Sequence, residues 1–316
     1  MTDTSAHSWT AWHLHLATTA TSAHDRVLRE VVGPVVRAHP ARPWFFLRYW
    51  QHGPHVRFRM RDLTPQQVND VSDRLAAHHA EAGEPRADET RLDAQDHARQ
   101  SERLAAAGEL GAALPAADVA TLLPPGVHHA VYEPEFDRYG GRDLMGLSED
   151  LFTLSSRLVL AFLAQPRDTA ARAVLALHAT AAALHTLPDV PARVAFCEAG
   201  LASWRDWLGR LGPSTEQVDA TVEALRDPGR LPPALSTAVS RHLEQPVTQG
   251  PLTSWYAAHA EATRVWAETA ARPGRILLSH THMLHNRLGL GVLDELATYG
   301  RLLAQLTATR ARTVTP

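Results

Sequence analysis

Residues 132–141 concentrate side chains that do not suit an ordinary hydrophobic core. The segment reads YEPEFDRYGG and combines aromatic rings, three carboxylates, one arginine and a Gly-Gly pair. Pro134 favours an extended lead-in, and the Gly-Gly pair supplies backbone freedom at the other end. A helical pattern begins at Arg142, so the segment precedes a helix N-terminus, where an anion is stabilised. We interpret it as part of a site in which Arg138 faces an anion.

A second cluster lies in the heptapeptide HVRFRMR, residues 55–61. Strict alternation places His55, Arg57, Arg59 and Arg61 on one face of a strand. Such a face is either open to water or opposite an acidic group. Arg48, in the preceding WFFLRYW segment, could join it across a hairpin. Because the guanidinium fork suits bidentate contact with carboxylates, the functional interpretation is a pocket for an acidic group.

The third cluster is the sequence SHTHMLHNRLG, residues 279–289. Helical spacing places His282 and Asn286 on one stripe, with His285 beside them and Arg287 one turn beyond Met283. This pattern suits an active site. A solvated histidine-rich face and a metal site are the alternatives, but the segment has no acidic ligand and no His-Glu-x-x-His arrangement. We therefore expect no metal here.

Composition narrows the chemistry. The chain has 316 residues, 45% of them hydrophobic, and a net charge of -3, so it can bury a sizeable core and has no bulk cationic bias towards nucleic acid or membrane. All 31 basic residues are arginine, which excludes Schiff-base chemistry on a lysine. Cys197 is the only cysteine, which excludes an internal disulfide and a cysteine-based zinc site. We expect a cytoplasmic protein that requires neither a metal nor an organic cofactor.

The hydrophobic period changes once along the chain. Strand patterns cover residues 9–16, 44–50 and 55–61, and helical patterns cover residues 25–38 and 65–82, the latter with Thr64 as N-cap. Residues 84–126 show the weakest pattern, and we expect a surface excursion or mobile loop there. From residue 142 to 310 the pattern is helical.

These elements predict an α+β fold. We expect a small mixed or antiparallel sheet, containing the hairpin of residues 44–61, packed with a largely helical second half. No linker divides the chain convincingly, so we predict one domain over residues 1–316, strand-rich in 1–141 and helical in 142–310.

The ordered set WFFLRYW with GPHVRFR, YEPEFDRYGG and HMLHNRLG resembles the small LanB-type proteins. These are similar to the C-terminal glutamate-elimination domain of lantibiotic dehydratases, also called the thiopeptide-type bacteriocin biosynthesis domain. The resemblance covers nearly the whole chain. It implies that a separate glutamyl-tRNA-dependent partner glutamylates Ser or Thr of a ribosomal precursor peptide, and that this chain then eliminates glutamate to give dehydroalanine or dehydrobutyrine. It also implies no cofactor.

The resemblance assigns the catalytic roles to Arg57, Arg59, Arg138 and His282. The turn sequence QHGP departs from the Asp-Pro turn common in dehydratase domains, which makes the strand arginines the weaker match. Elimination requires a base for a weakly acidic Cα proton and cations for the carboxylates, and these residues supply both. We expect the four to converge on one concave site, with a substrate-binding set comprising Arg48, Tyr139, Asn286, Arg287 and His285.

Two other functions stay open at this point. The same family includes thiopeptide pyridine synthases, which join two dehydroalanines in a formal aza-[4+2] cycloaddition and expel the leader peptide. The intact HMLHNR sequence favours elimination over this alternative. The third hypothesis is a non-catalytic subunit that binds the leader peptide and docks on a glutamylating partner. The expected partners are thus a precursor peptide and a glutamylating protein, without nucleic acid or membrane; a homodimer is possible.

Overall fold

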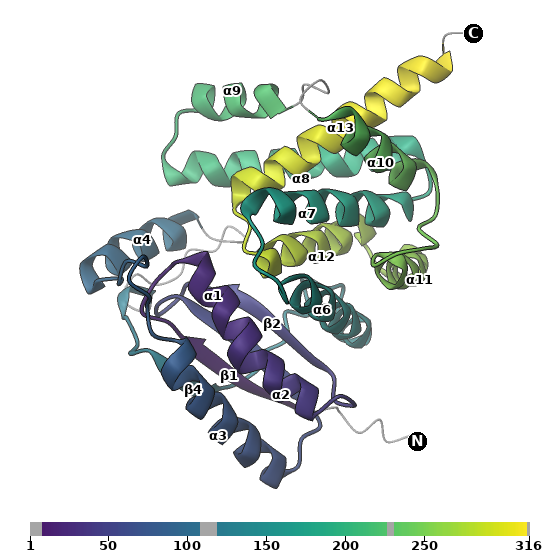
Figure 1. Cartoon of the computed structure of the whole chain (residues 1–316). Coiled ribbons are helices and arrows are strands. Elements are labelled where there is room, and N and C mark those ends of the chain that lie inside the picture. The colour runs from purple at the N-terminus through teal and green to yellow at the C-terminus, as the bar shows by residue number, and fades with distance from the viewer. Residues whose placement is uncertain (1–7, 108–118, 226–230, 315–316) are drawn as a thin grey trace. The chain divides into compact units, whose positions relative to one another are not determined.

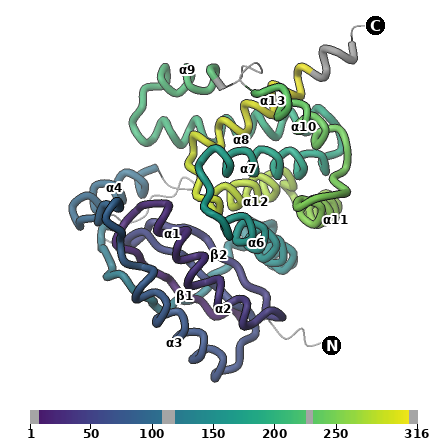
Figure 2. The backbone as a smooth tube through the Cα atoms, viewed as in Figure 1, coloured from purple at the N-terminus to yellow at the C-terminus, as the bar shows by residue number. Residues whose placement is uncertain are grey.

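The computed structural model describes residues 8–107, 119–225 and 231–314. Its contacts group the chain into two compact units: Met1–Pro134 with Ser155–Pro166, and Glu135–Leu154 with Arg167–Pro316. Figure 1 labels the elements, and Figure 2 traces the backbone. None of the helices within the described ranges has the length and apolar character needed to span a membrane.

The first unit contains a four-stranded antiparallel sheet, which confirms the small mixed or antiparallel sheet expected from the sequence but adds a strand to it. Its strands are β1 (Trp9–His15), β2 (Trp44–Tyr49), β3 (His55–Arg61) and β4 (Gly126–Ala130), in the order β2-β3-β1-β4. The β2-β3 hairpin turns through His52 and Gly53, which have φ angles of 63° and 106°. A left-handed backbone suits glycine, and the QHGP sequence supplies it at the second of these positions.

Helices cover one face of this sheet. They are α1 (Thr21–Val27), the π-helical turn η1 (Leu28–Val32), α2 (Gly33–Ala38) and α3 (Pro65–Ala82), seen in front of the strands in Figure 1. A further helix, α4, spans Ala94–Ala107. Trp12 and Phe58 are fully buried on the helix side, and Trp12 Nε1 donates to Ser72 Oγ of α3 at 2.9 Å. The predicted Thr64 N-cap of α3 is confirmed as a capping box with Gln67.

The second unit is helical. Its helices are α6 (Arg142–Phe162), whose last residues belong to the first unit, α7 (Thr169–His185), α8 (Val190–Leu211), α9 (Thr215–Leu225), α10 (Pro233–Glu244), α11 (Thr253–Thr269), α12 (Pro273–Leu288) and α13 (Val292–Val314). A Cβ at Gly200 of α8 would lie 2.7 Å from the Tyr299 ring, so glycine permits the close packing of α8 on α13. This packing fixes Tyr299, which is fully buried.

Two parts of the chain differ from the prediction. Residues 84–126 include helix α4, which is amphipathic, although a loop was expected there; part of that stretch, residues 108–118, lies outside the described residues. Strand β4 was not predicted. It contains only five residues, GVHHA, and its two histidines weaken the hydrophobic alternation by which a strand is recognised.

Candidate functional site

The first candidate cluster lies on the sheet face opposite the helices. Register places Arg57 between His13 of β1 and Leu47 of β2, and Arg59 between Ala11 and Phe45. Arg57 and Arg59 therefore share one face, as the alternation in HVRFRMR predicted. Arg59 is only 6% exposed.

Each guanidinium group of Arg57 and Arg59 lies close to an aromatic ring. The Arg57 guanidinium carbon lies 3.4 Å from the centroid of the Tyr49 ring, whereas that of Arg59 lies 5.1 Å from Phe45 and 4.9 Å from Tyr132. A cation over the face of an aromatic ring is stabilised by the ring quadrupole. The rings thus compensate part of the repulsion between neighbouring arginines.

Arg48 does not join this cluster, which corrects the expectation from the hairpin. It is paired with Val56, so it points to the helix side of the sheet. There its guanidinium forms a buried ion pair with Asp25 of α1, with Nη2 and Oδ1 2.7 Å apart. The pattern WFFLRYW is apolar at both parities, so alternation could not assign Arg48 to a face.

The second candidate cluster forms around α12 and begins with Arg138. Residues 136–140 form a turn directly before α6, and Gly140 and Gly141 have φ angles of 86° and 109°. A Cβ at Gly140 would lie 2.7 Å from Ile276 Cδ1 of α12, so glycine allows the turn to approach that helix. Arg138 Nε donates to Ser279 Oγ of α12 at 3.3 Å, and Nη1 is 3.2 Å from Glu135 Oε2.

His282 lies on α12 one helical turn after Ser279, the residue that Arg138 contacts. Its Nδ1 is 2.9 Å from Glu295 Oε2 on α13, and its ring lies 4.8 Å from that of Trp204 on α8. The His282 side chain keeps 19% of its surface exposed, whereas that of Glu295 keeps 2%. An Nδ1 proton donated to the carboxylate leaves the Nε2 lone pair available to accept a proton.

Glu295 is held as an anion inside the protein. Burial alone would raise its pKa, but the nearby imidazoles of His282 and His285 and hydrogen bonds from His282 and Tyr299 lower the pKa to about 2. Tyr299 donates to Glu295 Oε1 at 2.7 Å. Burial and the neighbouring carboxylate raise the pKa of Tyr299, so this hydroxyl stays protonated.

The remaining predicted site residues lie on or near α12. His285 is buried, with Nδ1 2.9 Å from the Thr281 carbonyl and Nε2 3.3 Å from Thr298 Oγ1. Arg287 is also buried, with its guanidinium 5.4 Å from the Phe152 ring. Tyr139 is 2% exposed and packs against Phe152. Asn286 is half-buried, as is His282 four residues earlier.

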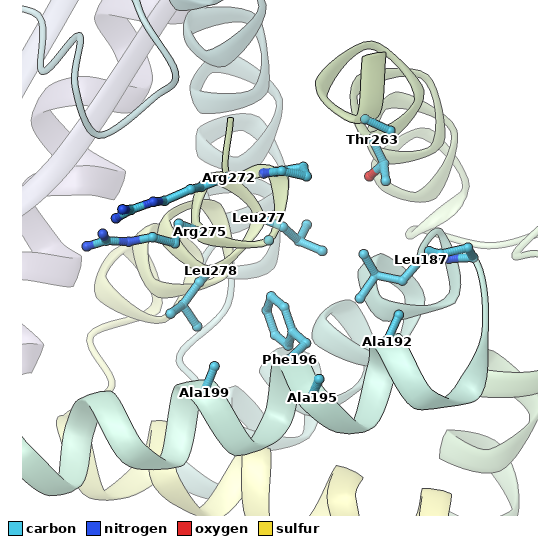
Figure 3. A pocket seen from close by; sticks show the side chains of 14 residues that line it. Leu187, Ala192, Ala195, Phe196, Ala199, Thr263, Arg272, Arg275, Leu277 and Leu278 are labelled. Atoms are coloured by element: carbon cyan, nitrogen blue, oxygen red, sulfur yellow. The ribbon is translucent and has the colours of Figure 1, made fainter. Parts of the chain in front are cut away.

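An apolar pocket of about 540 Å³ adjoins the N-terminal half of α12. Leu187, Phe196 of α8 and Leu278 of α12 line it, and Figure 3 shows these side chains around the hollow. Its lining contains the cations Arg272 and Arg275 but no carboxylate and no histidine. The pocket lining therefore provides neither a carboxylate nor an imidazole to act as a base, and His282 lies elsewhere on α12.

The four residues assigned to catalysis are divided between the units. Arg57 and Arg59 belong to the first unit, and Arg138 and His282 belong to the second. Their convergence on one substrate stays a prediction.

The comparisons place the chain in a family. The model of the family described as lantibiotic biosynthesis dehydratase C-term matches residues 9–307. The chain belongs to this family. The family description supports a role in lantibiotic biosynthesis without specifying the reaction. The comparison with curated proteins gives no match.

Solved structures share the fold at low sequence identity. The pyridine synthase TbtD from thiomuracin biosynthesis is 18% identical with a TM-score of 0.66, over 96% of this chain and 99% of that one. TsrL is 18% identical with a TM-score of 0.58, and the match covers 97% of this chain and 96% of TsrL. The tRNA-dependent lantibiotic dehydratase MibB from Microbispora sp. 107891 is 21% identical with a TM-score of 0.58; the match covers 96% of this chain but 28% of MibB.

Sequence reasoning missed Glu295, Trp204 and Ser279 as parts of the second cluster. Glu295 and Trp204 lie on different helices from His282, so no local spacing connects them with it. Ser279 stood at the edge of the SHTHMLHNRLG segment, but its contact with Arg138 depends on tertiary structure.

Proposed function

We propose that this protein eliminates glutamate from glutamylated Ser or Thr residues of a ribosomal precursor peptide, giving dehydroalanine or dehydrobutyrine. The observation that carries the proposal is the contact of His282 Nδ1 with the buried Glu295 carboxylate, 2.9 Å away. This pair has the form of an oriented general base. Family membership supports the reaction class.

In the proposed reaction, His282 Nε2 accepts the Cα proton of the glutamylated residue. Glu295 holds the imidazole in the tautomer that has a free Nε2 lone pair, and its charge stabilises the imidazolium that forms. The Cα–H electron pair becomes the new Cα=Cβ double bond, and the Cβ–O bond breaks to release glutamate as a carboxylate. Trp204 restricts the ring from the α8 side.

The arginines provide the complementary charge. We assign Arg138 to the acidic group nearest α12, because it approaches Ser279 one turn before His282. Arg57 and Arg59 are assigned to the carboxylates of the leaving glutamate, since both lie on one cationic sheet face. A fixed guanidinium fork suits this contact in the ground state and in the transition state.

The proposal implies two partners. The precursor peptide is the substrate, and a glutamyl-tRNA-dependent glutamylating protein supplies its modified form. No nucleic acid contact by this chain is required, because the activated glutamate arrives already esterified. A homodimer is compatible with the proposal but is not needed for it.

Pyridine formation is the second candidate function. The observation that favours it is the match to TbtD, which covers 99% of that pyridine synthase and 96% of this chain. A formal cycloaddition of two dehydroalanines consumes no glutamyl ester and ends with loss of water and leader peptide. A leader-binding scaffold is less well supported, since it has no use for an oriented His282–Glu295 pair.

One experiment distinguishes these functions. The purified protein is incubated with a chemically glutamylated peptide and, separately, with an azole-containing peptide bearing two dehydroalanines, and both products are measured by mass spectrometry. Loss of glutamic acid from the first peptide supports elimination. Leader release from the second, with an inert first peptide, supports cyclisation. Binding of peptide with neither reaction would leave the scaffold as the function.

A further inference from the structure

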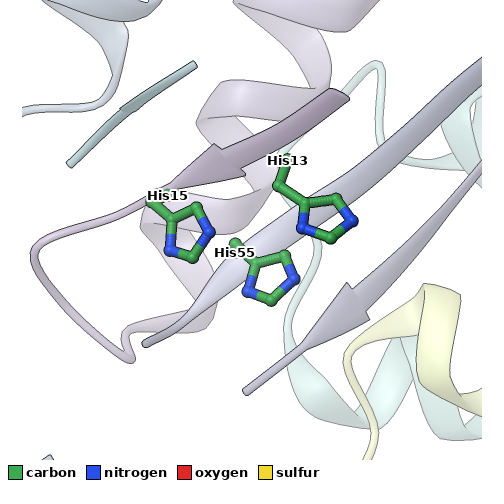
Figure 4. A group of neighbouring side chains, drawn as sticks. All are labelled: His13, His15 and His55. Atoms are coloured by element: carbon green, nitrogen blue, oxygen red, sulfur yellow. The ribbon is translucent and has the colours of Figure 1, made fainter. Parts of the chain in front are cut away.

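Three histidines meet on the polar face of the sheet, in the first unit. His13 and His15 come from β1 and His55 comes from β3, as Figure 4 shows. Each offers one ring nitrogen, and these three atoms lie within 4.8 Å of one another. His15 and His55 are each 1% exposed, and His13 is half-buried.

Strand pairing fixes this arrangement. His15 is directly opposite His55 in the register, and His13 is on the same face two residues before His15. The His55 ring lies 4.4 Å from the His15 ring and 4.7 Å from the His13 ring. Because all three residues lie within paired strands, their backbones are held more precisely than those of loop residues.

The hydrogen bonds of the rings indicate which nitrogens carry lone pairs. His55 Nδ1 is 2.8 Å from the Gly53 carbonyl, so this nitrogen carries the proton and Nε2 carries the lone pair. A backbone carbonyl in this position is typical of metal-binding histidines. Within the described ranges, His15 Nδ1 is buried and has no hydrogen-bond partner. A bound cation would satisfy a buried nitrogen that otherwise carries a desolvation cost.

Protons compete only weakly with a metal ion for the nitrogens of these three rings. Burial first, followed by the charges of Arg57 and Arg59, lowers the pKa of His13 to about 3. Burial first, followed by His128, lowers the pKa of His15 to about 4, and burial also lowers that of His55. All three imidazoles are therefore neutral at pH 7, the form in which histidine binds metals.

We propose that His13, His15 and His55 form a binding site for a divalent first-row transition metal ion, with Zn²⁺ as the fitting ion. Three imidazoles without a thiolate or carboxylate favour zinc, copper or nickel over calcium or magnesium. Zinc bonds of 2.0–2.1 Å in tetrahedral geometry require ligand nitrogens about 3.4 Å apart. The ring nitrogens now lie within 4.8 Å of one another, so metal binding requires the side chains to reorient from their stacked arrangement. A fourth position then faces away from the sheet and takes water or an anion.

Arg57 is the competitor for this site. Its Nε donates to His55 Nε2 at 3.3 Å, and its positive charge opposes a cation. The Arg57 guanidinium also lies over the Tyr49 ring. This contact can hold the guanidinium in place when its hydrogen bond to His55 is broken by metal binding. An anion in the fourth coordination position would lie close to this guanidinium and offset the repulsion. The ring of His128 lies 5.1 Å from that of His15, edge to face, so His128 is one of the histidines near the trio.

Metal binding is tested on the full chain after removal of metal with a chelator. Zinc alone is titrated by isothermal calorimetry, and Co²⁺ is used as a spectroscopic probe of tetrahedral coordination. We expect one ion per chain in the wild type and loss of this binding in His15→Ala and in His13→Ala. His129→Ala is the matched control, because His129 is on β4 but points to the helix side, where it contacts Ser72. Far-ultraviolet circular dichroism verifies that each variant is folded, and the half-buried His13 gives a variant with little risk to the core.

A second variant tests the competition. Arg57→Met removes the donor to His55 Nε2 and one positive charge, so it should bind zinc more tightly than the wild type. Equal zinc binding by wild type and His13→Ala, a cobalt spectrum without tetrahedral character, or weaker binding by Arg57→Met would each overturn the proposal. None of these measurements uses the elimination reaction, so failure of the proposed function leaves this result intact.

Discussion

His282 Nδ1 and the Glu295 carboxylate are 2.9 Å apart, on consecutive helices joined by a short turn at Gly289. Gly289 ends α12 in the left-handed conformation, with a φ angle of 71°, and its N–H is 2.9 Å from the Asn286 carbonyl. The turn thereby brings α13 back along α12. A carboxylate buried to 2% exposure is retained because His282 and Tyr299 both donate to it.

Replacement of Glu295 by glutamine should lower kcat for elimination by roughly a hundredfold or more, because the histidine loses its orienting anion. KM should change little, since Glu295 is assigned no contact with substrate. Single-turnover rates with glutamylated peptide measure the effect. Glu261→Gln, at an exposed carboxylate on α11, is the matched control. An equally active Glu295→Gln variant would mean that the pair is only structural.

Replacement of His282 by alanine should leave the glutamylated peptide bound but unreacted. Loss of a positioned general base typically costs on the order of a hundred- to ten-thousandfold in rate. Affinity is measured by fluorescence anisotropy and turnover by mass spectrometry, with His78→Ala on the exposed face of α3 as control. Full elimination activity in His282→Ala would remove the central residue of the mechanism.

Much of the fold could be predicted because its elements carry strong local patterns. HVRFRMR alternates over its whole length, and β3 begins and ends as expected. Helix α3 has both a threonine cap and a proline in its first turn. Strand β4 and helix α4 were missed: β4 is short and histidine-rich, and α4, although amphipathic, follows a turn-rich stretch. Their positions follow from pairing with β1 and from tertiary packing, which local sequence does not specify.

The site was predictable only in part, for the same reason. Arg57 and Arg59 follow from period two, and the α12 stripe follows from helical spacing. The prediction that Arg48 joins the arginine face was wrong because both faces of WFFLRYW are apolar. Its position in the alternation therefore did not indicate which face it lies on. Glu295 and the histidine trio depend on contacts between separate elements. These contacts form through tertiary packing and strand register, which spacing along the chain does not reveal.

Replacement of Arg59 or Arg138 by lysine should weaken both substrate binding and turnover. Lysine keeps the charge but loses the fixed fork, and a carboxylate contact acts in the ground state as well as in the transition state. We expect KM to rise and kcat to fall for each variant. Arg74→Lys, at an exposed position of α3, is the control. If KM and kcat change in only one of the two variants, the substrate carboxylates contact only the unit that contains that arginine.

Arg48 should prove to be a structural residue. Its ion pair with Asp25 is buried, and removal of one partner leaves an uncompensated charge that typically costs about 3–5 kcal/mol. Arg48→Met should therefore lower the free energy of unfolding by about this amount, measured by urea denaturation. The double variant with Asp25→Asn should recover part of the loss, because neither charge is then buried alone. Additive losses in the double variant would contradict this assignment.

The free energy of unfolding should depend on pH in acid because Glu295 titrates there. Its pKa is lowered from 4.5 to about 2 on folding, so its contribution to stability is fully present above pH 4.5 and is lost as the pH falls towards 2. At 1.36 kcal/mol per pKa unit this contribution is roughly 3 kcal/mol. Glutamine cannot titrate, so the stability gap between wild type and Glu295→Gln should be largest near pH 5 and should shrink towards pH 2.

Urea unfolding followed by circular dichroism at several pH values measures this gap. Tyr299→Phe is the matched comparison, because it removes one hydrogen bond to Glu295 while the ring keeps its packing against α8. Its pH dependence should lie between those of wild type and Glu295→Gln, since the hydrogen bond from Tyr299 is one of several interactions that lower the Glu295 pKa. A gap that stays constant from pH 5 to pH 2 would show that Glu295 is not held as an anion in the folded protein, and the orienting role assigned to it for His282 would fail with it.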